Sequence, residues 1–91
     1  MSAKTSFRDL GVWCRALDLA VEVYRLTDGF PKRETYGLTA QMRNCAASVP
    51  ANIAEGRGRR GDGDFLRFLH YIAAGSLAEL ETLLELSRRL A

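Results

Sequence analysis

The chain has 91 residues, of which 47% are hydrophobic and 26% are charged, and its net charge is +2. This length leaves room for one small domain, which buries a smaller share of its surface than a larger protein does. Because its apolar runs fall short of the roughly 18 residues of a membrane span, a transmembrane protein is excluded. The small net charge does not by itself indicate binding to nucleic acid.

The N-terminal residues contain no apolar stretch of the secretory type, and we therefore expect a cytoplasmic protein with reduced thiols. Cys14 and Cys45 lie in apolar-periodic segments without C-x-x-C spacing. We interpret them as buried small hydrophobic residues rather than as metal ligands. The sequence therefore predicts no metal site and no cofactor.

A first helix is predicted over about 7–28. Ser6 and Asp9 have the spacing of a capping box at its start, and Gly29 supplies a stop signal after it. Two adjacent apolar rows run along this helix, whereas packing on one side needs a stripe only about 100° wide. We therefore expect the first helix to contact neighbours on two sides.

A second helix is predicted over about 34–56, with a conventional core face and a smooth face of alanines. Its third face is polar and consists of Gln41, Asn44, Ser48, Asn52 and Glu55. These groups either face water or meet polar groups of another helix. Pro50 favours the second alternative, because Ser48 or Asn52 could bond a carbonyl that the proline leaves without a donor.

A third helix is predicted over about 62–91. Ser76 and Glu79 project toward its apolar side, where a carboxylate needs a donor. We expect these two residues to meet the polar face of the second helix and to help specify helix register. The resulting polar seam is defined as Gln41, Arg43, Ser48, Asn52, Glu55, Ser76 and Glu79.

Short connections between these helices predict an all-α, antiparallel up-down bundle that forms a single domain over 1–91. Three helices leave an open groove, and the predicted third helix reaches Ala91 without a cap. Either a fourth helix is missing from this chain or a neighbouring subunit takes its place. The surplus of apolar surface predicts a homo-oligomer.

Motifs that suggest catalysis fail on their context. The G-x-G-x-x-G match at 56–61 follows a helix rather than the strand of a dinucleotide site. Asp62-Gly63-Asp64 resembles the opening of a calcium loop, but Ala73 occupies the position of the bidentate glutamate. His70 has no acid or nucleophile at helical spacing that would complete a triad. We therefore expect no enzymatic activity.

A basic glycine-arginine hinge joins the second and third helices. It carries Arg57, Arg59 and Arg60, and Arg67 lies one turn into the next helix. Glycines on this hinge would let the guanidinium groups reach a phosphate backbone. Alternatively, the arginines neutralise the acidic residues that follow them, and the residues alone leave both alternatives open.

Several motifs spread over nearly the whole chain resemble one family. They are Phe7-Arg8-Asp9-Leu10 with Trp13, Phe30-Pro31, Tyr36-Gly37-Leu38, Gln41-x-Arg43, Ser48-x-Pro50-x-Asn52-Ile53-x-Glu55-Gly56, Phe65-x-x-Phe68-Leu69 and Gly75-Ser76-x-x-Glu79-x-Glu81. This set resembles the four-helix bundle proteins encoded in intervening sequences of bacterial 23S rRNA genes. That family is similar in fold to the accessory protein of diversity-generating retroelements, a basic pentameric bundle that binds nucleic acid.

The resemblance implies a pentamer-forming four-helix bundle, although the family's fourth helix has no counterpart after Ala91. From the hinge and the resemblance together, we expect a non-enzymatic oligomer that binds RNA or DNA backbones through Arg57, Arg59, Arg60 and Arg67. The alternative is a structural module that binds another protein and has no role with nucleic acid.

Overall fold

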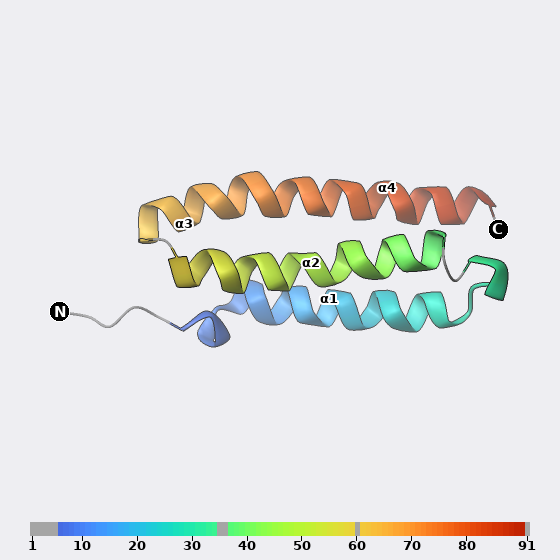
Figure 1. Cartoon of the computed structure of the whole chain (residues 1–91), viewed down its shortest axis with the longest axis horizontal. Coiled ribbons are helices and arrows are strands. Elements are labelled where there is room, and N and C mark those ends of the chain that lie inside the picture. The colour runs from blue at the N-terminus through green and yellow to red at the C-terminus, as the bar shows by residue number, and fades with distance from the viewer. Residues whose placement is uncertain (1–5, 35–36, 60, 91) are drawn as a thin grey trace.

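The computed structural model describes residues 6–34, 37–59 and 61–90. Three helical arms run back and forth along one long axis, so that each is antiparallel to the next in sequence (Figure 1). The Cα atoms extend over 53 × 20 × 18 Å. Within the described ranges every regular element is helical, which confirms the predicted all-α antiparallel bundle.

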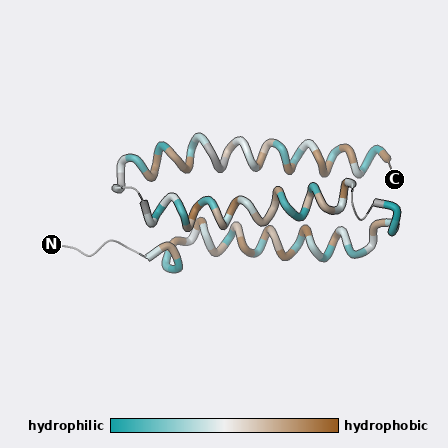
Figure 2. The backbone as a smooth tube through the Cα atoms, viewed as in Figure 1, coloured by the Kyte–Doolittle hydropathy of each residue, from teal (hydrophilic) through white to brown (hydrophobic). Residues whose placement is uncertain are grey.

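The first two arms are α1 (Gly11–Asp28) and α2 (Leu38–Arg59). The third arm is continuous but changes its winding, with α3 (Asp62–Phe68), a π-helical turn η3 (Leu69–Ala73) and α4 (Ala74–Leu90). Two short 3-10 turns, η1 (Phe7–Asp9) and η2 (Lys32–Glu34), precede α1 and α2. Figure 2 shows that the connection containing η2 is strongly hydrophilic. None of the described helices has the length and apolar character needed to cross a lipid bilayer.

The predicted first helix is interrupted at Leu10. The Ser6 hydroxyl accepts a hydrogen bond from the backbone N–H of Arg8 at 3.3 Å, but it caps η1 rather than α1. Leu10 is extended, with φ −81° and ψ 124°, and its carbonyl accepts the first bonds of α1. Phe7 turns back onto Trp13 with a 5.2 Å edge-to-face ring contact, which gives the break a packing reason.

The core follows the side of α2 that faces both other arms. One cluster includes Val23 of α1, Met42 of α2 and Leu80 of α4, and a second joins Ala16, Ile53 and Phe65 near the other end. The second helix therefore contributes to every layer of the core. This position explains why α2 carries so little charge along most of its length.

The two outer arms pack against α2 but not closely against each other. Among the described residues, no Cα atom of α1 comes within 8 Å of a Cα atom of α4. As a result, α1 buries one side only, and large apolar side chains remain exposed on its other sides. These exposed residues are Val12, Leu17, Val21, Tyr24 and Leu26. The chain alone thus does not provide the second neighbour that the two apolar rows predict.

The second helix continues past the predicted end at residue 56 and includes Gly56 and Gly58 in its last turns. A Cβ atom at Gly56 would overlap the ring of Phe68 from the neighbouring arm. Gly56 is therefore required by close helix packing rather than by a hinge, and the connection to α3 is shorter than the sequence suggested. Gly61 precedes α3 in an extended conformation, and its carbonyl accepts a 2.9 Å bond from the N–H of Phe65.

Candidate nucleic-acid interface and polar contacts

Arg57 does not have the exposed position that the predicted hinge required. Arg57 lies within α2 and is only 8% exposed. Its guanidinium carbon is 5.2 Å from the ring centroid of Phe65. A cation over an aromatic face is attracted by the ring quadrupole, which stabilises this burial. The prediction that glycines expose Arg57 is therefore wrong for the single chain. Its observed contact joins the end of α2 to α3.

Arg67 is the predicted arginine that the structure places openly on the surface. Its side chain is 84% exposed and forms a 3.0 Å ion pair with Asp64, three residues earlier in α3. The backbone of Arg59 ends α2, whereas the Arg59 side chain and the whole of Arg60 lie outside the described part of the chain. Arg67 of α3 therefore lies at the surface, in the arm that begins where α2 ends (Figure 1).

On α2, the polar seam is partly open in the single chain. Gln41 and Glu55 are exposed, whereas Ser48 and Asn52 are half-buried. The Ser48 hydroxyl donates to the Cys45 carbonyl at 2.7 Å. Pro50 leaves a different carbonyl, that of Ala46, without its helical donor. Ser48 does not reach this carbonyl, because a serine hydroxyl in a helix bonds the carbonyls three or four residues before it. Burial of the seam was expected for the assembled protein and stays a prediction.

The α4 side of the polar seam meets α2 at Cys45. The buried Cys45 thiol donates to the backbone carbonyl of Ser76 at 3.3 Å. Burial raises the pKa of this thiol, and the nearby Glu79 carboxylate raises it further by its charge and by a hydrogen bond. Glu79 therefore lies close to Cys45 of α2, but it is exposed, so its burial on the apolar side stays a prediction. The sequence predicted only a hydrophobic role for Cys45. Its polar contact could have been inferred from Ser76 and Glu79, which are polar residues on the apolar side of the third helix.

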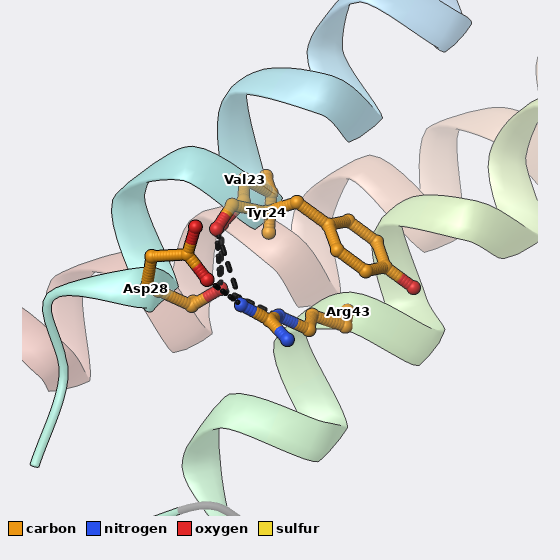
Figure 3. Close-up of polar contacts among 5 residues, drawn as sticks. Val23, Tyr24, Asp28 and Arg43 are labelled. Atoms are coloured by element: carbon orange, nitrogen blue, oxygen red, sulfur yellow. Dashed lines mark hydrogen bonds and ion pairs between the residues drawn. The ribbon is translucent and has the colours of Figure 1, made fainter.

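Arg43 belongs to a different contact from the one predicted. It reaches from α2 to the end of α1, where its Nε donates to the Thr27 hydroxyl at 2.7 Å and one terminal nitrogen binds Asp28 at 2.9 Å (Figure 3). The same nitrogen donates to the Tyr24 carbonyl at 3.2 Å. The assignment of Arg43 to the polar seam is therefore wrong, because its acceptors lie near the carboxyl end of α1, where the helix dipole also favours a cation.

Thr27 is the residue that makes this contact possible, and the sequence analysis missed it. It is buried, and its hydroxyl donates to the Val23 carbonyl at 2.8 Å while accepting from Arg43. A threonine in the last turn of an otherwise apolar helix face was the available signal. A buried hydroxyl at such a position requires a partner from a neighbouring helix.

The family model that describes the 23S rRNA-intervening sequence protein matches residues 8–91. The chain belongs to this family. The match covers all three helical arms and confirms the family suggested by the sequence motifs. A comparison with curated proteins gave no match.

In this member of the family, an open apolar groove runs between α1 and α2. Ala47, Ala51 and Ala54, from the alanine face that the sequence indicated on α2, form part of its lining. The residues that line it are Phe7, Trp13, Leu17, Ala20, Ala47, Pro50, Ala51 and Ala54. The groove adjoins the exposed apolar side chains of α1, so the apolar surface extends beyond the groove itself.

The described residues offer no grouping that resembles a metal centre. Within 6–34, 37–59 and 61–90, no three His, Cys, Asp or Glu residues are placed to hold an ion. His70 is exposed on the π-helical turn η3. The surface features that the described residues provide are an exposed arginine at one end of the bundle and an apolar groove along α1 and α2.

Proposed function

We propose that this protein is a non-enzymatic, oligomeric helical bundle that binds nucleic-acid backbones at the end of the bundle where α2 meets α3. The observation that carries the proposal is the exposed Arg67, with Arg59 and Arg60 close to it in sequence. An arginine binds phosphate through a planar set of donors. We also propose that the protein is cytoplasmic, a compartment in which both cysteines would stay reduced.

The ion pair of Arg67 is compatible with this role. Exposed pairs of this kind contribute about 0–1 kcal/mol, so a phosphate can replace the Asp64 carboxylate at little cost. Arg57 supports the site indirectly, because its contact with Phe65 holds α3 against the end of α2. The binding residues are therefore Arg59, Arg60 and Arg67, with Arg57 in a positioning role.

Oligomerisation is the second part of the proposal. A second copy of the chain covers the α1–α2 groove, whose lining is almost entirely apolar and whose alanines permit close approach. Closed cyclic symmetry is a common way for identical chains to cover such surfaces. The resemblance described above points to five subunits. A ring would repeat the arginine cluster and strengthen its attraction for phosphate.

A salt titration of nucleic-acid affinity tests the binding role. We expect the affinity of a labelled RNA to fall steeply with salt, and Arg67→Ala to reduce the slope by about 0.7–0.9 per lost phosphate contact. The matched control is Arg25→Ala, because Arg25 forms a similar ion pair with Glu22, also three residues away and largely exposed, on α1. An unchanged slope in Arg67→Ala, or equal effects of both changes, would contradict the assignment.

The alternative is a structural module that binds another protein, and the same groove favours it. Under this alternative the arginines provide solubility only, and no nucleic acid binds even at low ionic strength. Light scattering separates self-association from partner binding. A monodisperse monomer at micromolar concentration would contradict the proposed oligomerisation. If the protein is an oligomer, Ala51→Glu is expected to dissociate it without changing the helix content measured by circular dichroism.

A further inference from the structure

The outer surface of the third arm carries an aromatic side chain that packing within the chain does not explain. Tyr71 is 79% exposed, the highest value among the exposed large hydrophobic residues of the described ranges. Leu66, at 66%, is also largely exposed on the same arm. Arg67 and His70 lie between them in sequence and are exposed as well. We call these four residues the α3 outer face.

The spacing of these residues brings them together. Arg67 and Tyr71 are four positions apart on a continuous helical rod, as are Leu66 and His70, and side chains at this spacing lie on one face. Both His70 and Tyr71 belong to the π-helical turn η3. Turns of this type are rare and occur frequently at functional sites. The α3 outer face therefore combines a phosphate-binding group with an exposed ring one turn away.

This combination is the one that single-stranded nucleic acid recognises. An unpaired base can stack on an aromatic ring while the adjacent phosphate binds an arginine. In a duplex, the flat faces of the bases are covered by their neighbours, so an exposed tyrosine on a helix surface gains no stacking contact. Arg67 alone would not distinguish the two forms, because phosphates are present in both.

We propose that the α3 outer face binds single-stranded nucleic acid in preference to duplex, with a base stacked on Tyr71 and a neighbouring phosphate on Arg67. This inference rests on the proposed binding function and specifies its substrate class. Tyr71 discriminates between the two forms by its ring, and Arg67 supplies the salt-dependent part of the affinity. The phenol hydroxyl is not required, because every base presents a stacking face.

The test titrates the full chain into two fluorescently labelled RNA probes and measures the anisotropy of each probe. One probe is an oligouridylate of about 20 nucleotides, and the other is an RNA duplex with the same number of phosphates. We expect the single strand to bind more tightly. Tyr71→Ala should weaken single-strand binding about 5- to 150-fold, the range for loss of one stacked base, and leave duplex binding unchanged. Tyr71→Phe should retain the affinity, and Tyr71→Leu, which keeps apolar bulk without a ring, should behave like Tyr71→Ala.

The outcomes separate this inference from the proposed function. Equal affinities for the two probes, or an equal loss of both in Tyr71→Ala, would overturn the single-strand inference while leaving backbone binding intact. Absence of binding to both probes at low salt would overturn the proposed function and the inference with it. Because Tyr71 is exposed, its variants are expected to keep the wild-type circular dichroism, which verifies that they are folded.

Discussion

The guanidinium carbon of Arg43 lies 4.6 Å from the ring centroid of Tyr24, while the same guanidinium bonds the Tyr24 carbonyl. One side chain of α2 therefore covers both the ring and the backbone of a residue near the end of α1 (Figure 3). Removing it leaves the buried Thr27 hydroxyl without its donor. The contact explains how two antiparallel helices keep their register at this end of the bundle.

Arg43→Ala is expected to lower the free energy of unfolding by about 1–3 kcal/mol, since it leaves the buried Thr27 hydroxyl without its donor. Arg43→Lys should recover only part of the loss, because an ammonium group lacks the planar fork of donors. Urea unfolding monitored by circular dichroism measures both. Arg25→Ala provides the control, and a loss as large as that of Arg43→Ala would show that the Arg43 contacts contribute nothing specific.

Gly56 and Gly58 are expected to respond to alanine with opposite signs. Alanine normally stabilises a helix interior by about 0.5–1 kcal/mol relative to glycine, and we expect this gain at Gly58, which has open space around it. At Gly56 the added methyl group overlaps Phe68, and we expect a loss of about 1–3 kcal/mol. Thermal or urea unfolding measures both changes. A stabilised Gly56→Ala would refute the close packing of α2 against the third arm.

Leu80 and Leu86 provide a matched pair on α4. Leu80 is 2% exposed in the core, whereas Leu86 is 46% exposed. We expect Leu80→Ala to cost about 2–5 kcal/mol, because it removes apolar contacts with α1 and α2 and leaves a cavity. Leu86→Ala should change stability by about 0.5 kcal/mol or less. Equal losses would mean that α4 buries a different face, and comparison of urea midpoints decides between the two.

Cys45 is expected to react slowly with iodoacetamide, and the exposed Cys14 quickly, because burial raises the pKa of the Cys45 thiol and restricts access. Mass spectrometry of the labelled chain under native conditions resolves the two sites. Equal labelling rates that persist at low reagent concentration would contradict the buried position of Cys45. Labelling in urea, where both thiols become accessible, gives the reference rates.

The same thiol gives stability a pH dependence. The folded chain holds the Cys45 proton more tightly than the unfolded chain, whose pKa has the ordinary value of 9.0. Stabilisation by the protonated thiol is therefore complete below pH 9.0 and is lost as the pH rises through the folded-state pKa. We expect the stability difference between the wild type and Cys45→Ala to decrease above this pH. A difference that stays constant at alkaline pH would contradict the raised pKa.

Local signals were sufficient to predict the helical arms and their antiparallel order. Gly29 and the apolar periodicity before it locate the end of α1 at Asp28, as observed. The end of α2 could not be predicted in this way, because Gly56 and Gly58 are weak helix formers, whereas Gly56 packs closely against Phe68 and Arg57 lies over Phe65. Those phenylalanines lie in the next arm, so a local reading of the glycines indicated a hinge.

The candidate site shows the same limitation. The position of Arg67 on the outer side of α3 could be predicted from helical spacing, and its exposure agrees with it. The burial of Arg57 and the contact of Arg43 with α1 depend on which helices are neighbours in space. Charge and spacing alone do not distinguish an arginine that binds phosphate from one that fastens two helices together.

The separation of α1 from α4 affects how members of this family can diverge. Each outer arm shares its interior contacts chiefly with α2, and their backbones do not approach each other within the described residues. A substitution on the outward side of α1 therefore requires no compensating change on the outward side of α4. The two surfaces can therefore change independently, whereas a change on the inner side of α2 must suit both arms at once.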